Sequence, residues 1–293
     1  MANVWDAMRK HEAEQARRKA EAPDAPADAS PAAAAEPGAD ADAPAVEAAP
    51  PTRPKRTRVA IPPGPTVNAN GKYAEVLRAY HEPGSDRAEE YRSLRTSLLA
   101  NATHDRVCCV VTSAEPEEGK TVTCLNLAMV MAELVDRRTI VVDLDLRKKD
   151  RMAGLLSAAP SPGMSDMLRG EQRFADCRQP TAYPNLSFLP AGVMSSARVG
   201  ELVGRPELED IVTELRREYD FVIIDTPPIN RFSDASVIGR TAGEALLVVR
   251  MNRTRRESVN KAIRLLHAGN VPISGMVLTH QKFYIPKYIY RYS

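Results

Sequence analysis

Short apolar runs alternate with helical patterns along the chain from about residue 86 onward. Solid hydrophobic runs such as TIVVDLD, FVIIDT and ALLVVR predict strands that are buried on both faces, as in a parallel sheet covered by helices. We expect strands at about 107–112, 139–144, 186–190, 221–225, 244–249 and 273–278, and helices at about 85–101, 120–134, 197–218 and 255–268. This order predicts a doubly wound α/β fold with a mostly parallel sheet, in which ligands bind at the carboxyl ends of the strands.

The N-terminal part of the chain lacks such runs and is rich in Ala and Pro. Residues 21–50 contain seven Asp or Glu and no Lys or Arg, and 11 of the 23 prolines precede residue 66. Such a stretch offers too little apolar area to offset the entropy of ordering it. We therefore expect a short N-terminal helix (1–20), a disordered linker (21–74), a nucleotide-binding domain (75–281) and a tyrosine-rich tail (282–293). Trp5 makes the N-terminal helix either a docking tag for a partner or a helix that simply frays.

A candidate phosphate loop lies between the strand near 107–112 and the helix that follows it. Gly119 lets the backbone approach a phosphate, Lys120 supplies a positive charge, and the Thr121 hydroxyl can ligate Mg²⁺. The usual pattern begins with Gly, whereas this chain has Ala114. We expect nucleotide contacts from Ala114, Glu115, Pro116, Glu117, Glu118, Gly119, Lys120, Thr121 and Val122.

Three carboxylates follow two of the predicted buried strands. Asp143 and Asp145 end the run near 139–144, where strand alternation predicts that they share one face, and Asp225 ends the run near 221–225. Buried carboxylates are costly unless they are paired or bind a metal, and Mg²⁺ with a triphosphate is a natural partner. The sequence therefore predicts an ATP and Mg²⁺ site at this edge of the sheet, with Thr121, Asp145 and Asp225 as the metal ligands.

Composition excludes several other classes of protein. The formal net charge of +2 gives no reason to expect a nucleic-acid partner. The basic run at 53–58 favours a solvated charge block over a lipid or acidic-partner contact. The first 20 residues are charged throughout and no apolar run reaches about 18 residues, so we expect a cytoplasmic protein. The four cysteines show no metal-binding spacing.

Together the motifs SAEPEEGKT, IVVDLDLR and VIIDTPP resemble those of the bacterial tyrosine kinase family, a branch of the MinD/ParA-like P-loop ATPases. The resemblance covers about residues 78–293. It implies that Lys120 and Thr121 bind phosphate and Mg²⁺, that Asp145 and Asp225 hold the metal, and that Asp143 orients or deprotonates the acceptor tyrosine. It also makes Arg147 a contributor near the catalytic site.

Two positions depart from the related patterns. MinD/ParA relatives carry a signature lysine five residues before the phosphate-loop lysine, where this chain has Glu115, so the kinase branch is favoured. The last core strand of the family often ends in Asn near the adenine, whereas this chain has Thr279, which leaves the base contacts open.

Four of the nine tyrosines lie in the last ten residues, at Tyr284, Tyr288, Tyr290 and Tyr292. Their alternation with other residues also fits an edge strand, but Pro286 and the interspersed basic residues favour an exposed tail. By resemblance, we expect these tyrosines to be the phosphoacceptors, modified in trans by a neighbouring subunit.

A helical stripe of Glu89, Arg92 and Arg95 also matches the family pattern. In that family the stripe joins subunits into a ring, and we favour this role over an intrahelical Glu–Arg pair, although both can be true. The resemblance further implies control of extracellular polysaccharide synthesis, a membrane activator of the chain-length-regulator type that brings the kinase to the membrane, and a protein-tyrosine phosphatase. The alternatives are a MinD/ParA-type positioning ATPase on a membrane or DNA, or a catalytically weak adaptor.

Overall fold

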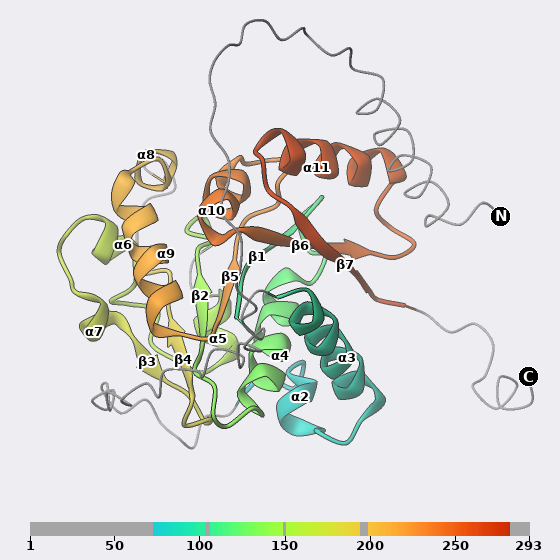
Figure 1. Cartoon of the computed structure of the whole chain (residues 1–293), viewed down its shortest axis with the longest axis horizontal. Helices are drawn as coiled ribbons and strands as arrows, with labels where there is room; N and C mark the ends of the chain where they lie inside the picture. Colours follow the sequence, from blue (N-terminus) through green and yellow to red (C-terminus); the bar gives the residue numbers. More distant parts are fainter. Residues whose placement is uncertain (1–72, 103–105, 149–150, 194–198, 282–293) are drawn as a thin grey trace, which may run out of the picture. The chain divides into compact units, whose positions relative to one another are not determined.

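The computed structural model describes residues 73–102, 106–148, 151–193 and 199–281. These residues form a seven-stranded sheet with the order β3-β4-β2-β5-β1-β6-β7 (Figure 1). All neighbouring strands pair in parallel except β3 and β4, which are antiparallel. The strands are β1 (Val107–Ser113), β2 (Thr139–Asp143), β3 (Gln179–Pro180), β4 (Leu186–Leu189), β5 (Phe221–Asp225), β6 (Glu244–Arg250) and β7 (Ile273–Thr279).

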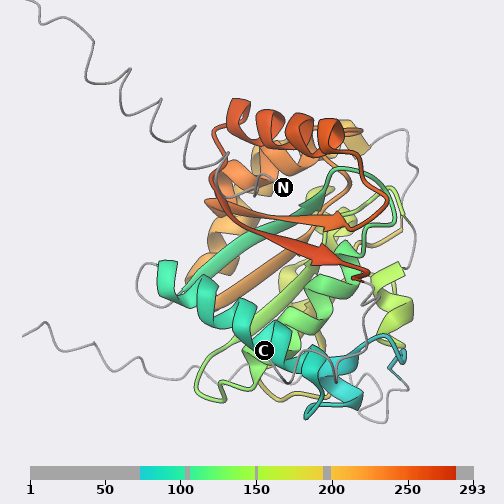
Figure 2. The ribbon, with the colours of Figure 1, turned by 90° about the vertical axis from the view of Figure 1, so that its right-hand side faces the viewer.

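Helices cover both faces of this sheet, as Figure 2 shows with α11 on one side and α3 and α4 on the other. The helices are α2 (Arg78–His81), α3 (Asp86–Asn101), α4 (Lys120–Ala132), α5 (Arg151–Leu155), α6 (Met164–Leu168), α7 (Phe174–Cys177), α8 (Val199–Val203), α9 (Pro206–Glu218), α10 (Asp234–Ala242) and α11 (Arg256–Ala268). The prediction of a doubly wound, mostly parallel α/β fold is confirmed.

Alternation along the central strands divides the core into two layers. Val110 of β1 belongs to the cluster beneath α9, α10 and α11, whereas Cys109 and Val111 belong to the cluster beneath α3 and α4. β1, β2 and β5 are buried almost throughout, which explains their uninterrupted apolar sequences. Their carboxyl ends therefore meet at one edge of the sheet, between the two layers.

The single helix expected at 197–218 is wrong, because the chain forms α8 and α9 instead. Pro206 occupies the first turn of α9, and Arg205 before it has extended backbone angles (φ −79°, ψ 144°). Proline disfavours the helical conformation in the preceding residue, so the first helix must end before it. Acidic residues in the first turn of α9 and Arg216 and Arg217 in the last turn suit the helix dipole.

The described part of the chain begins at Tyr73, whereas the predicted domain begins at residue 75. The Tyr73 side chain is buried, and its hydroxyl accepts a hydrogen bond from the Ala182 backbone N–H at 2.8 Å. The predicted N-terminal helix (1–20), nearly all of the predicted linker and the tail (282–293) lie outside the described residues.

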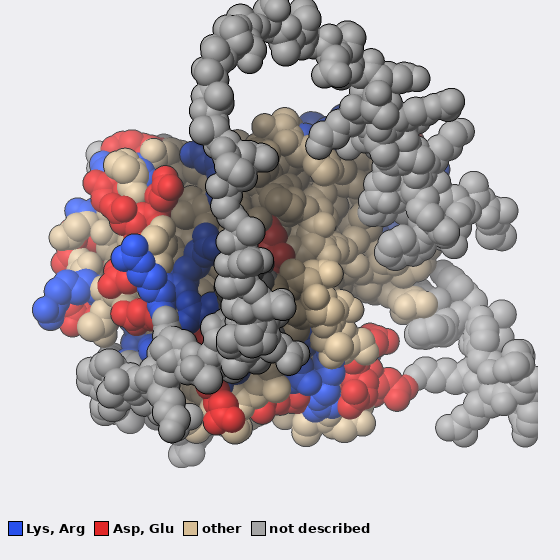
Figure 3. Space-filling model, in the orientation of Figure 1, with Lys and Arg blue, Asp and Glu red and all other residues tan. Residues whose placement is uncertain are grey.

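Charged side chains of both signs are interspersed on the face of the molecule in Figure 3, most densely on the left, where Figure 1 places α8 and α9. Such mixed surfaces create no strong field of one sign. Across the described parts of the chain, no helix is both long and apolar enough to cross a bilayer.

Candidate active site at the carboxyl ends of β1, β2 and β5

The phosphate loop runs from the end of β1 to the first residue of α4, Lys120. Glu117 (φ +62°) and Gly119 (φ +97°) both adopt left-handed backbone conformations, which turn the chain sharply into the helix. A Cβ atom at residue 119 would lie 3.4 Å from Cγ2 of Thr279, so glycine satisfies both the angle and the close approach. Ser113 closes the loop at its base by donating its hydroxyl to the Glu115 carbonyl at 2.7 Å.

One flank of this loop is braced against β6 and β7 by Glu118. Its buried carboxylate accepts hydrogen bonds from the Glu115 backbone N–H at 2.9 Å and from the Thr254 hydroxyl. The hydroxyl of Thr279 donates to the Glu118 carbonyl at 2.7 Å. Thr279, which replaces the Asn common in the family, therefore supports the loop from the end of β7.

The other flank of the loop carries the residues that are predicted to bind phosphate and metal. Lys120 and Thr121 open α4, and the Thr121 hydroxyl donates to Oδ2 of Asp225 at 2.6 Å. Asp225 is the last residue of β5 and is almost completely buried. This contact joins the loop to the strand end across 104 residues of sequence, as the motif analysis predicts.

Asp143 ends β2 directly beside Asp225, since the two residues are paired in the parallel register of β2 and β5. The backbone N–H of Asp145 donates to Oδ1 of Asp143 at 3.1 Å. Strand alternation does not place Asp145, because β2 ends at Asp143. A turn places it instead, in which the Lys148 backbone N–H donates to the Asp145 carbonyl at 2.9 Å.

Burial makes the negative charges of this site costly. It raises the pKa of Asp225 to about 6, although Lys120 and the Thr121 hydroxyl act in the opposite direction. Burial likewise raises the pKa of Asp145, against the effect of Lys120 and Lys148. Both carboxylates thus lie where a further positive charge would stabilise them.

The unsatisfied oxygens fit a magnesium–nucleotide complex. Oδ1 of Asp145 and Oδ1 of Asp225 are both buried without a hydrogen-bond partner in the described part of the chain. Within those same residues, no three carboxylate, His or Cys side chains come close enough to hold a metal by themselves. Mg²⁺ typically takes one or two carboxylates and completes its shell with phosphate oxygens and water, which matches this donor set.

Lys148 is a candidate that motif reasoning missed. Its half-buried ammonium interacts with the charges of Lys120, Asp145 and Asp225, and burial followed by the charge of Lys120 lowers its pKa. An anion between the two lysines would relieve their repulsion. The signal in the sequence was a second cation directly after the IVVDLDLR motif.

Arg147 lies near the site, but its guanidinium is bound by other side chains of the protein. Its guanidinium forms two hydrogen bonds to the buried Asp234, at 3.1 and 3.2 Å, and stacks 4.0 Å from the ring centroid of Phe232. No local sequence pattern marks this pair, because 87 residues separate the partners. Arg147 thus fixes the segment after Asp145 to the start of α10.

Known proteins resemble this chain in sequence and fold. A family model described as an AAA domain matches residues 117–260. Tyrosine-protein kinase wzc of Salmonella typhimurium is 32% identical over 73% of this chain and 30% of its own length. Putative tyrosine-protein kinase CapB of Staphylococcus aureus is 29% identical over 69% of this chain and 88% of its own. The kinase domain of Escherichia coli tyrosine kinase ETK superposes with a TM-score of 0.65 at 28% identity, covering 72% of this chain and 83% of that one.

The chain belongs to the bacterial tyrosine kinase family. It spans less than a third of the length of wzc but most of the length of CapB.

The stripe of Glu89, Arg92 and Arg95 lies on α3, and its two arginines contact Glu133 at the end of α4. The Arg92 guanidinium donates hydrogen bonds of 2.6 to 3.1 Å to the Glu133 carboxylate, and Arg95 donates to the same carboxylate at 2.9 Å. Arg92 also pairs with Glu89, so the intrahelical pair exists. Glu89 is 64% exposed, whereas the two arginines are mostly buried against Glu133. Only part of the stripe is thus presented to another subunit.

Proposed function

We propose that this chain is an ATP- and Mg²⁺-dependent protein-tyrosine kinase that phosphorylates the tyrosine cluster of its own C-terminal segment. The observation that carries the proposal is the pair of buried carboxylates, Asp145 and Asp225, each with an unsatisfied oxygen beside Lys120. Membership of the tyrosine kinase family then selects phosphoryl transfer to tyrosine among the reactions that such a centre can support.

Each residue of the centre has a role that follows from its position. Lys120 neutralises the β- and γ-phosphates, while the backbone N–H groups at the start of α4 bind phosphate oxygens. Thr121, Asp145 and Asp225 would hold Mg²⁺, which when bound supplies further neutralisation of the phosphate charge. Lys148, whose ammonium interacts with the charges of Lys120, Asp145 and Asp225, would add a second positive charge near the phosphates.

Asp143 is the candidate general base that accepts the proton of the acceptor tyrosine hydroxyl. A tyrosine hydroxyl has a pKa near 10, so it arrives protonated. The phenolic oxygen forms a bond to the γ-phosphorus as the bond to the β,γ-bridging oxygen breaks, and ADP leaves. Because the transition state is loose, positioning matters more than early deprotonation, and Asp143 takes the proton late.

The acceptors are Tyr284, Tyr288, Tyr290 and Tyr292. β7 ends at Thr279, whose hydroxyl donates to the Glu118 carbonyl of the phosphate loop. The acceptor tyrosines begin only five residues further along the chain, and so short a connection reaches the site of a neighbouring subunit more easily than its own, which supports transfer in trans. The exposed Glu89 and its stripe then supply part of a ring interface, and tail phosphorylation loosens that ring by adding negative charge.

The family also supports a cellular setting for this reaction. We place the kinase in the control of extracellular polysaccharide synthesis or export, held at the inner face of the membrane by an activator of the chain-length-regulator type and reversed by a protein-tyrosine phosphatase. A MinD/ParA-type switch is disfavoured, because Glu115 occupies the position of the signature lysine and its carboxylate accepts a hydrogen bond from Ser258 at 3.1 Å.

The test uses labelled ATP with Mg²⁺ and mixed variants of the whole chain. One variant carries Lys120→Met with the tail intact, and the other keeps Lys120 but has all four tail tyrosines changed to Phe. Label on the Lys120→Met chain only when the two are mixed is the expected result. ATP hydrolysis without phosphotyrosine would contradict the kinase assignment, and label retained by the tail-Phe chain alone would remove the tail as the acceptor.

A further inference from the structure

Exposed charge is distributed unevenly among the helices of this domain. Between residues 231 and 268, a fully described span that contains α10 and α11, seven Lys or Arg side chains are exposed and Glu257 is the only exposed acid. The preceding helix, α9, has the opposite balance, with four exposed acids and two exposed arginines. The surface that α10 and α11 form therefore carries a net positive charge.

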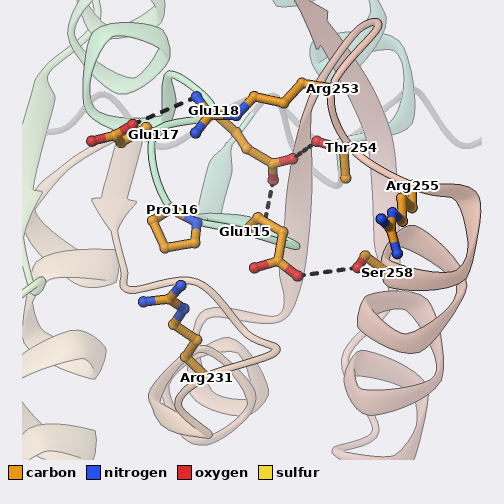
Figure 4. A pocket seen from close by; sticks show the side chains of 9 residues that line it. All are labelled: Glu115, Pro116, Glu117, Glu118, Arg231, Arg253, Thr254, Arg255 and Ser258. Carbon is orange, nitrogen blue, oxygen red and sulfur yellow. Dashed lines mark hydrogen bonds and ion pairs between the residues drawn. The ribbon is translucent and has the colours of Figure 1, made fainter.

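Three of the seven cations belong to the nucleotide site. Arg231, Arg253 and Arg255 line a cleft of about 630 Å³ on the outer flank of the phosphate loop, the flank that Glu118 braces (Figure 4). The loop residues 115–118 line the same cleft, so it is part of the site already described. The other four cations lie outside this cleft and are Arg240, Arg256, Lys261 and Arg264.

α10 and α11 share one outer surface. The two helices lie side by side in Figure 1, and the Ser236 hydroxyl donates to the Leu265 carbonyl at 3.3 Å. The buried residues of each helix face the sheet, so the exposed residues lie on the opposite side. We call this outer surface the basic face and define it by Val237, Arg240, Lys261, Arg264 and Leu265.

The three cations of the basic face have their charges available. Within the described residues, Arg240, Lys261 and Arg264 form neither a hydrogen bond nor an ion pair. The nearest acid along α11 is Glu257, one turn before Lys261, so at most one of the three charges is offset. The basic face therefore attracts anions.

Two apolar side chains lie among these cations. Val237 and Leu265 are each 36% exposed. Lipid headgroups suit both parts of this surface, because the cations meet the headgroup charges while the apolar side chains enter the boundary of the bilayer. The phosphate backbone of a nucleic acid would use the cations alone. Charge and apolar exposure together thus favour an anionic bilayer as the occupant.

We propose that the basic face of α10 and α11 binds the anionic headgroups of a membrane surface directly. This inference goes beyond the function proposed above, in which the activator holds the kinase at the membrane. Each basic residue near an anionic surface strengthens binding about fivefold, so three give a weak contact that salt releases and that reinforces the activator. Because α3 lies on the other side of the sheet (Figure 2), this contact leaves the exposed Glu89 open to another subunit.

The experiment measures co-sedimentation of the whole chain with vesicles of equal parts phosphatidylglycerol and phosphatidylcholine, or of phosphatidylcholine alone. Every chain carries Gln in place of the four cations of the basic run at 53–58, so that this run does not contribute. We expect binding to the anionic vesicles only, and its loss at about 0.5 M salt. The combined variant Arg240→Gln, Lys261→Gln, Arg264→Gln should bind about 10- to 100-fold more weakly.

A matched control removes three exposed cations elsewhere. Arg87→Gln, Arg173→Gln and Arg217→Gln together lose the same charge from α3, the start of α7 and α9, and should leave the vesicle affinity unchanged within about twofold. A second variant, Val237→Ser with Leu265→Ser, should bind vesicles about threefold more weakly because it removes the apolar contribution. Equal thermal unfolding of all variants shows that folding is not the cause of a lost contact.

Four results would overturn the proposal. They are no binding to anionic vesicles, unchanged binding by the basic-face variant, an equal loss in the matched control, and tighter binding to duplex DNA than to the vesicles. Vesicle binding requires no phosphoryl transfer, so Lys120→Met should bind as well as the unsubstituted chain. Failure of this inference is thereby distinguishable from failure of the kinase assignment.

Discussion

On the outer flank of the phosphate loop, Glu115 and Glu118 are satisfied by hydrogen bonds from Ser258, Thr254 and the loop backbone. On the inner flank, Asp145 and Asp225 are buried like Glu118, yet each keeps an oxygen without a partner in the described part of the chain. The same residue chemistry thus serves two purposes. The paired carboxylates stabilise the conformation of the phosphate loop, whereas the unpaired carboxylates are available to bind a ligand that is not part of the protein.

Asp225→Asn should give the largest effect, on the inner flank. The amide keeps the shape and can still accept from Thr121, but it loses the charge that Mg²⁺ requires, so kcat should fall about 10²- to 10³-fold. The free energy of unfolding without ligand should stay equal or rise, since a buried charge is removed. Asp210→Asn, on the exposed face of α9, is the control. A large loss of stability in Asp225→Asn would mean that this carboxylate is a brace rather than a ligand.

The pH dependence of the unfolding free energy is a second way to distinguish the two flanks of the phosphate loop. Asp225 has a folded-state pKa of about 6 against an ordinary value of 3.8, so the folded chain binds this proton more tightly than the unfolded chain. The unfolding free energy of the metal-free protein should therefore fall by about 3 kcal/mol as the pH rises from about 4 to 6 and then level off. Denaturant titrations across this range measure it. The same decline in Asp225→Asn would assign it to another group.

Glu118→Ala should act mainly on stability, on the outer flank. The substitution leaves the Glu115 backbone N–H and the Thr254 hydroxyl without their hydrogen-bond acceptor, which should lower the unfolding free energy by about 1–3 kcal/mol. Glu117→Ala removes a neighbouring carboxylate that is 64% exposed and should cost almost nothing. Equal unfolding midpoints for the two variants would contradict the bracing role of Glu118.

Lys148→Gln should have the smallest effect of the four. Losing one half-buried charge near the phosphates should weaken Mg²⁺–ATP binding about 3- to 10-fold while leaving the fold intact. Calorimetric titration beside Lys261→Gln, an exposed lysine of α11, provides the comparison. Unchanged affinity would show that Lys148 faces solvent rather than nucleotide.

Local sequence predicted much of the inner flank. The apolar runs located β1, β2 and β5, and a parallel sheet necessarily brings their carboxyl ends together, so Lys120, Thr121, Asp143 and Asp225 converge as expected. Asp145 was also a correct neighbour of Asp143, although a turn places it rather than the strand.

Pairs between residues far apart in the sequence could not be predicted in the same way. Glu118 meets Thr254 across 136 residues, and Arg147 meets Asp234 across 87, so no local pattern marks either pair. The division into α8 and α9 could have been predicted, because Pro206 marks the start of a new helix. The apolar periodicity on both sides of Pro206 nevertheless suggested one continuous helix.

The position of Mg²⁺ in a crystal structure of the whole chain with a non-hydrolysable ATP analogue tests the central claim most directly. We predict an ion ligated by the Thr121 hydroxyl and phosphate oxygens at about 2.0–2.1 Å, with the unpaired oxygens of Asp145 and Asp225 contacting it directly or through water. A nucleotide bound elsewhere, or an ion that leaves both of those oxygens unpaired, would contradict it.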